Sequence, residues 1–209
     1  MNARLLCVAL TLFACGCVGN APLREQAAGG VVIDLAAVPR GFENYTLFIS
    51  TSYDYARLAN TDDVKALLAK RFKEFAAAIG PRSYAAFVGD PSSQKLDAAA
   101  GRTMLDRVKA NYGIQADYQN GPYLIVLRDH PADAPSKKQT PAAIALRGRS
   151  GMDVGLILDE LIIEIRKFQP PAGKSASDGE TLWQAVQRGW EAGGSSPARQ
   201  WVTILCACG

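Results

Sequence analysis

Apolar residues follow two kinds of pattern between residues 45 and 168. Short runs rich in β-branched and aromatic side chains predict strands, and longer stretches with apolar residues three or four positions apart predict amphipathic helices. We expect Thr61 and Asp153 to cap two of the helices and residues 51–55 to form a polar loop. The predicted strands are 45–50, 83–88, 123–127 and 142–146, and the predicted helices are 61–79, 96–112 and 153–168.

The order of these elements, βαβαββα, predicts an α/β fold with a four-stranded mixed sheet flanked by helices. Strands that alternate with helices form parallel pairs through right-handed crossovers, whereas the last two strands, joined by a loop, are expected to be antiparallel. The apolar residues of 123–127 do not alternate with polar ones, so this strand is expected at the centre of the sheet with both faces buried. The β-prone residues 31–35 can add an edge strand.

Residues 169–209 are expected to form a C-terminal extension of the core. The pattern within it predicts a helix over 180–190 and a strand over 200–205. Leu156 and Ile163 lie off the main apolar stripe of the last core helix and indicate a second buried face. We expect the extension to pack back on the core and to cover these two side chains.

The N-terminus has the pattern of an export signal. Arg4 precedes an apolar run from Leu5 to Ala14, and the next polar stretch begins near Asn20. This run is too short for a helix that crosses a bilayer, which needs roughly 20 residues, but it fits the apolar region of a secretory signal peptide. Residues 1–14 are therefore expected to be a signal peptide that is removed.

The end of this run resembles the lipobox of bacterial lipoproteins. The residues Leu-Phe-Ala before Cys15 give an aliphatic, a variable and a small residue, and a second register ends at Cys17 with Gly16 before it. The resemblance implies that Cys15, or alternatively Cys17, is acylated and that residues 15–30 tether the protein to a membrane. No Asp follows either cysteine, so the family's inner-membrane retention signal is missing. The protein would face the periplasm, attached to the outer membrane if the source is Gram-negative.

The five cysteines lie close to the chain ends, and none lies between residues 18 and 205. This distribution suits a protein exported to an oxidising compartment. Cys206 and Cys208 flank one alanine, and on a regular strand their α-carbons would stand about 6.5–7 Å apart, at the outer edge of disulfide reach. The alternatives are a labile redox pair, two incidental thiols, and a bridge to Cys17 that ties the termini together.

The element order, with Gly121-Pro122-Tyr123 leading into the third strand, resembles a thioredoxin-like domain over residues 31–168. In that family the first two strands are parallel, the last two are antiparallel, and a cis-proline before the third strand faces the active-site loop. The resemblance implies that Pro122 is this proline and that Gly121, Pro122 and Tyr123 form a binding loop. The family's Cys-x-x-Cys motif lies between the first strand and the first helix, where residues 51–61 contain no cysteine. Because a thiolate is the nucleophile of such sites, we expect the domain to be redox-silent.

Composition narrows the classes of function. The formal net charge is +3 and no long basic block is present, which argues against nucleic-acid binding. The single histidine, His130, excludes a zinc site that needs two or three histidines, and we expect it to be solvated in a loop. No cofactor or metal is predicted.

The favoured function is a non-catalytic envelope lipoprotein, held to the membrane by its lipid, that binds a protein partner or serves as an assembly module. Tyr53, Tyr55 and Tyr118 could line a binding edge, although one or two exposed tyrosines need no functional explanation. The alternative is a thiol–disulfide oxidoreductase that uses Cys206 and Cys208.

Overall fold

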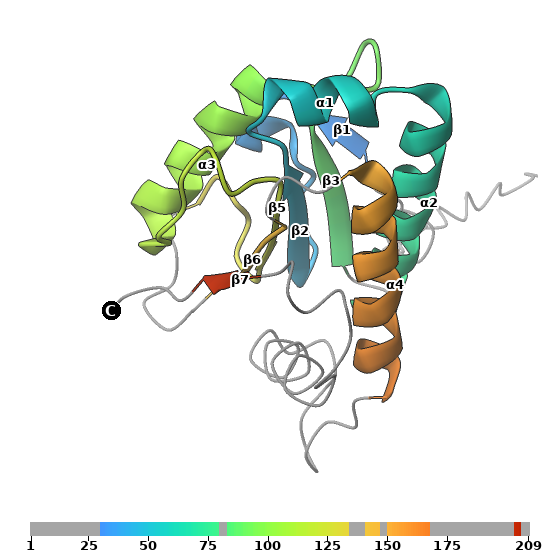
Figure 1. The fold of residues 1–209 in the computed structure, drawn as a ribbon. Helices are drawn as coiled ribbons and strands as arrows, with labels where there is room; N and C mark the ends of the chain where they lie inside the picture. The colour runs from blue at the N-terminus through green and yellow to red at the C-terminus, as the bar shows by residue number, and fades with distance from the viewer. Residues whose placement is uncertain (1–29, 80–82, 134–140, 147–149, 168–202, 206–209) are drawn as a thin grey trace, which may run out of the picture.

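The structure is a computed structural model that describes residues 30–79, 83–133, 141–146, 150–167 and 203–205. Within these residues, helices pack around one mixed sheet (Figure 1). The helices are the 3-10 turn η2 (Leu35–Ala37), α1 (Tyr53–Ala59), α2 (Asp62–Ile79), α3 (Ala98–Tyr112) and α4 (Gly151–Lys167). The strands are β1 (Gly30–Val32), β2 (Asn44–Ile49), β3 (Ser83–Asp90), β4 (Lys95–Leu96), β5 (Tyr123–Leu127), β6 (Ala142–Ala145) and β7 (Thr203–Leu205).

The strands are arranged in the order β1-β3-β2-β5-β6-β7, and β4 pairs with β3. β2 lies parallel to β3, with Thr46 opposite Ala85, and antiparallel to β5, with Leu47 opposite Ile125. β5 is also antiparallel to β6. All five residues of β5 are buried, and strands flank it on both sides, which confirms its predicted central position.

Helices cover both faces of the sheet, α3 on one face and α2 with α4 on the other (Figure 1). Successive residues of a strand point to opposite faces. In β2, Leu47 and Ile49 pack on the side of α3, whereas Phe48 packs on the side of α2 and α4. Because both faces are covered, all six residues of β2 are buried, including the polar residues Asn44 and Thr46.

The predicted α/β class and the four core strands are confirmed. β2, β3, β5 and β6 begin and end within two residues of the expected positions, and the parallel β2–β3 pair and the antiparallel β5–β6 pair are those expected. Among the described strands, the second parallel pair that the alternation of strands and helices implied does not form, because β5 is antiparallel to β2 and does not pair with β3. The sheet is larger than four strands because β1, β4 and β7 extend it. The sequence analysis predicted strands at the positions of β1 and β7, but β4 was not predicted.

The prediction of a loop over residues 51–55 was wrong, because α1 begins at Tyr53. The Ser52 hydroxyl accepts a hydrogen bond from the Tyr55 N–H at 3.3 Å, and this bond caps the helix. Only one side of this short helix, including Tyr55 and Ala59, is buried. Seven residues are too few to show a helical period against a polar background, so the pattern indicated a loop.

Both predicted helix caps also differ. Thr61 precedes α2, but its hydroxyl donates to the Leu58 carbonyl at 2.9 Å instead of accepting a bond from the helix. Asp153 lies in the first turn of α4, and Ser150 is the capping residue. The Asp153 N–H donates to the Ser150 Oγ at 3.2 Å, while the Asp153 carboxylate accepts from the Ser150 N–H. This reciprocal pair is a capping box, in which the cap lies three positions before the acid.

The C-terminal extension, residues 169–209, lies outside the described residues apart from β7. On α4, Leu156 and Ile163 are 57% and 49% exposed. The helix expected over 180–190 to cover them is also outside the described residues, so its packing stays a prediction.

Candidate functional site

Polar and aromatic residues gather where β2 ends and α1 begins. Ser50 and Thr51 follow β2 and are fully buried. The Thr51 hydroxyl donates to the Tyr118 carbonyl at 2.7 Å, and the Thr51 carbonyl accepts from Arg102 Nε at 2.9 Å. Thr51 thereby joins the segment after β2 to helix α3 and to the loop before β5.

The loop before β5 packs against this segment. The peptide bond between Gly121 and Pro122 is cis. A β-carbon at position 121 would lie 2.3 Å from the Thr51 Oγ1, so a larger residue would displace the Thr51 hydroxyl. The Pro122 carbonyl accepts from the Leu146 N–H at 2.8 Å, which anchors the loop beside the end of β6. The Gly121–Pro122 loop therefore faces Thr51.

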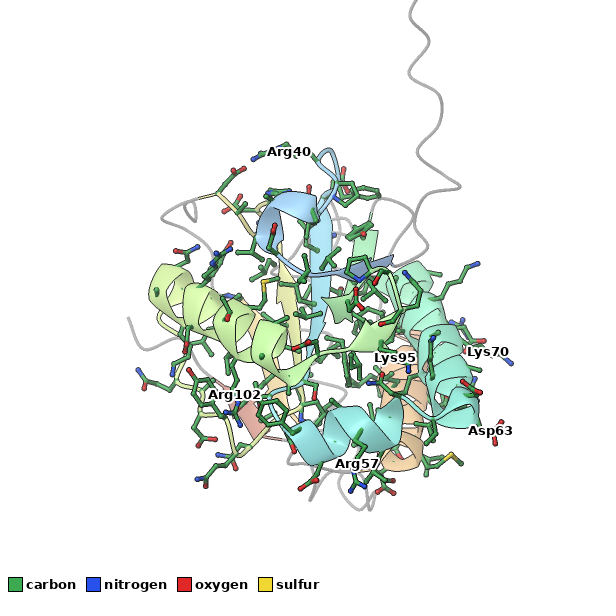
Figure 2. The ribbon with its side chains drawn as sticks, turned by 90° about the horizontal axis from the view of Figure 1, so that it is seen from above. Arg40, Arg57, Asp63, Lys70, Lys95 and Arg102 are labelled. Atoms are coloured by element: carbon green, nitrogen blue, oxygen red, sulfur yellow. The ribbon has the colours of Figure 1, made fainter. Side chains whose placement is uncertain are left out.

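Gly101 brings α3 to the same place. A β-carbon at position 101 would lie 1.8 Å from the Ser50 carbonyl oxygen, so the close approach requires glycine. Arg102 then reaches toward two aromatic rings: its Cζ lies 4.8 Å from the ring centre of Tyr53 and 5.1 Å from that of Tyr118. Figure 2 shows Arg102 between α1 and α3. Each cation–π contact at an exposed site contributes about 0.5–1 kcal/mol, so Arg102 helps to hold both rings in place.

Both tyrosines are exposed to solvent: the exposed fraction is 61% for Tyr53 and 37% for Tyr118. The Tyr118 hydroxyl donates to the Asp106 carboxylate, and this hydrogen bond raises the pKa of Tyr118 above its ordinary value. The hydrogen bond also fixes the orientation of the phenol. We refer to Thr51, Tyr53, Arg102, Tyr118 and Pro122 as the Arg102 cluster.

Within the Arg102 cluster, Thr51 and Pro122 are buried, whereas Tyr53, Tyr118 and part of Arg102 are exposed. The hydroxyls of Thr51 and Tyr118 both donate their hydrogens within the protein, and residues 18–205 contain no cysteine that could act as a nucleophile. Among the residues that the structure describes, no group of three or more His, Cys, Asp or Glu side chains is placed to hold a metal ion. What the cluster presents is an aromatic face and a guanidinium, both of which are enriched at protein interfaces.

Comparison with known proteins assigns no family to the chain. No protein-family model matches it, and no curated protein or solved structure matches it either. Within the described ranges, no helix combines the length and apolar character needed to cross a bilayer.

The three residues predicted to form a binding loop play different parts. All three residues are buried, and Gly121 and Pro122 face Thr51. The Tyr123 hydroxyl donates to the Asp117 carbonyl, and burial, together with the charge of Asp117, raises the pKa of Tyr123 to about 12. Tyr123 therefore supports the loop from the interior and does not face a partner.

The cysteines that the sequence analysis singled out lie outside the described residues: Cys15, Cys17, Cys206 and Cys208. The strand that precedes the C-terminal pair is described. β7 pairs with β6, with Thr203 opposite Ala145 and Leu205 opposite Ala143. Ala145 lies opposite Tyr123, the residue that directly follows Pro122. β7 therefore begins at the Pro122 end of the sheet and runs away from this end toward Leu205.

Sequence reasoning missed Arg102, which lies 51 positions from its partner Thr51. The only local signal was a glycine inside an apolar helix, which can mark a close approach of another backbone. The expectation that His130 is solvated was wrong. His130 is buried, its Nε2 lies 2.8 Å from the Val38 carbonyl oxygen, and its Nδ1 accepts from the Ala132 N–H. This histidine is a structural link between two loops.

Proposed function

We propose that the protein is a lipid-anchored lipoprotein of the bacterial cell envelope whose redox-silent, thioredoxin-like domain binds a protein partner. The anchor rests on the sequence alone: the cationic start, the apolar run and the lipobox ending at Cys15 or Cys17. Acyl chains there would make a stable anchor, since each buried methylene contributes about 0.8 kcal/mol. Mass spectrometry of the mature protein should find an acylated N-terminal cysteine, whereas a mature chain that starts after residue 20 would contradict the anchor.

The arrangement of the core supports the thioredoxin-like relationship. β2 and β3 are parallel, β5 and β6 are antiparallel, and helices cover both faces of the sheet. Pro122 directly precedes β5, and its loop faces Thr51, next to the start of α1. Thioredoxins carry their cysteines at this position, and here the chain has Thr51, Ser52 and Tyr53 instead.

The observation that carries the binding proposal is the pair of exposed tyrosine rings beside Arg102, in the place of the family's thiols. Within the described residues, Arg102 makes a single hydrogen bond, through Nε. Its terminal nitrogens can donate to carbonyl or carboxylate oxygens of a partner, and hydrogen bonds from a charged donor are the stronger kind. Tyr53 and Tyr118 add rigid apolar area at the same spot. Tyrosine and arginine side chains of this kind supply a large share of the binding energy at protein interfaces.

The alternative, a thiol–disulfide oxidoreductase, would need Cys206 and Cys208 to meet the Pro122 loop. The register of β7 favours this arrangement less, because β7 leaves the Pro122 end of the sheet before the chain reaches Cys206. The binding module is therefore the function that the geometry supports best.

The proposal is tested by affinity purification of the full-length protein from native membranes, with the co-purifying proteins quantified by mass spectrometry. The test variant is Arg102→Ala. The matched control is Arg57→Ala, since Arg57 is an arginine of α1 whose side chain is 77% exposed. We expect a discrete partner whose recovery falls at least about tenfold with Arg102→Ala and is unchanged with Arg57→Ala. Equal recovery with both variants, or no partner with the wild type, would count against the proposal.

A further inference from the structure

A second site, which shares no residue with the Arg102 cluster, lies between α2 and the edge of the sheet. It is a cavity of about 500 Å³ bounded by β1, β3, β4, α2 and the end of α1. Small-molecule sites in proteins have volumes of about 300–1,000 Å³, so this cavity has the size of a ligand site.

The floor of the cavity is apolar. Leu68 and Phe72 of α2, Phe87 of β3 and Leu96 of β4 line it. The ring centres of Phe72 and Phe87 lie 4.5 Å apart, and Leu68 and Phe72 are buried. Water forms no hydrogen bonds with such an apolar surface, whereas an aliphatic chain that lies on it is itself removed from water.

One wall of the cavity is fixed by Asn60, the residue that ends α1. The Asn60 Oδ1 accepts from the Leu96 N–H at 2.8 Å, and the Asn60 Nδ2 donates to the Leu96 carbonyl at 3.0 Å. Gln94, also on this wall, adopts a left-handed φ of 55° while its Nε2 donates to the Pro91 carbonyl. These bonds hold the turn before β4 against α1, so the wall forms without a ligand.

The rim of the cavity is positively charged. Lys65, Lys70 and Lys73 of α2 line it, and none of the described lining residues is acidic. In the described part of the chain, none of these lysines forms an ion pair, and the Lys65 Nζ lies 3.5 Å from the Ser93 carbonyl oxygen. Figure 2 shows Lys70 and, from β4, Lys95 on the same side of the molecule. Lys70 also lies within electrostatic reach of the Glu74 carboxylate, which is not a lining residue of the cavity. Three ammonium groups beside an apolar floor are complementary to an anion with an apolar tail.

We infer that this cavity binds an amphipathic anion, with a single aliphatic chain on the floor and a carboxylate or phosphate head at the lysines. The positive rim favours an acidic head group, because three lysines and no carboxylate are among the described lining residues. The apolar floor favours an aliphatic tail. This inference does not depend on the proposed protein-binding function, since the two sites share no residue.

The test is calorimetric titration of the mature chain, residues 15–209, with dodecanoate, dodecyl phosphate and the neutral dodecanol, in buffer without detergent. The chain carries Cys15→Ser and Cys17→Ser so that no attached lipid competes. We expect saturable binding of one dodecanoate per chain and weaker binding of dodecanol. Comparison of the two anions distinguishes a fatty-acid head from a phosphate head, and binding of either anion supports the inference.

Two sets of variants test the contributions of the apolar floor and of the charged rim separately. Ala69 is an exposed lining residue of α2, so Ala69→Phe fills the cavity and should weaken dodecanoate binding at least about tenfold. Ala66→Phe is the matched control, because Ala66 is exposed on the same helix and does not line the cavity. The double change Lys70→Gln and Lys73→Gln should weaken dodecanoate binding about three- to tenfold and leave dodecanol unchanged.

Several results would overturn the inference. They are the absence of saturable binding, equal effects of Ala69→Phe and Ala66→Phe, and dodecanol binding as tight as dodecanoate binding. Binding that appears only after removal of residues 15–29 from a chain that begins at residue 15 would also overturn it, because the mature chain itself would then fill the cavity. Circular dichroism and the urea midpoint of each variant verify that the fold is intact.

Discussion

Gly101 is the residue whose substitution tests the packing around the Arg102 cluster most sharply. It lies inside α3, where alanine is favoured over glycine by about 1 kcal/mol. A β-carbon there would lie 1.8 Å from the Ser50 carbonyl oxygen and 2.9 Å from the Ser50 carbonyl carbon. Both groups belong to backbone, so relief requires α3 to move away from the end of β2. Such a movement would also stretch the 2.9 Å hydrogen bond from Arg102 to Thr51.

Overpacking of a buried site costs about 1–3 kcal/mol, and a clash of backbone against helix lies at the upper end of that range. After the gain in helix propensity, we expect Gly101→Ala to lower the free energy of unfolding by about 2 kcal/mol. For a chain of this length that corresponds to a fall in Tm of about 4–8 °C. The partner recovery described for Arg102→Ala should fall with Gly101→Ala as well, because the guanidinium moves with α3.

Gly155→Ala is the matched control. Gly155 lies inside α4, and a β-carbon there would lie 3.3 Å from Leu67 Cδ2, the end of a side chain that can turn aside. We expect this change to raise the free energy of unfolding by up to about 1 kcal/mol. Urea denaturation followed by circular dichroism measures both variants. If the two changes had the same effect within about 0.5 kcal/mol, the close approach of α3 to Ser50 would be refuted.

Three further predictions concern other parts of the chain. His130→Ala removes the 2.8 Å bond to the Val38 carbonyl and should lower the free energy of unfolding by about 1–3 kcal/mol in urea, whereas a change within experimental error would contradict the link. Burial raises the pKa of Tyr112 and of Tyr123 to about 12, above the value of about 10 in an unfolded chain, so the folded state keeps these protons longer. Stability should therefore be full below pH 10 and should fall as the pH rises toward 12, and a constant urea midpoint over that range would refute this sign. The purified protein should reduce insulin no faster than a free dithiol at equal concentration, and turnover that disappears with Cys206→Ser in a folded protein would restore the oxidoreductase alternative.

The sequence predicts the core elements well because burial on both faces leaves a strong local signal. β5 has no polar residue to alternate with, and α4 repeats its apolar residues at helical spacing. The short helix α1 was missed because its few buried residues stand among Ser, Asp and Arg. The cap of α4 was assigned to Asp153, although Ser150, three positions earlier, completes the sequence signature of a capping box.

Only part of the candidate site was predictable. Pro122 was found because a Gly-Pro pair precedes a strongly apolar strand. The partners of Thr51 lie 51 and 67 positions away in sequence, so nothing local brings Arg102 or the Tyr118 carbonyl to it. The cavity was not predictable for the same reason. Its lysines lie together on α2, but its walls come from four other elements that are distant in sequence.

The central claim, that the Arg102 cluster is a partner-binding surface, is tested most directly by photo-cross-linking in living cells of the native host. The photoreactive p-benzoylphenylalanine replaces Tyr53 in the full-length protein. As a control it replaces Ile33, which is 52% exposed and follows β1 at the sheet edge. We predict one discrete adduct from position 53 that disappears when Arg102→Ala is added, and none from position 33. No adduct from position 53, or the same adducts from both positions, would contradict the claim.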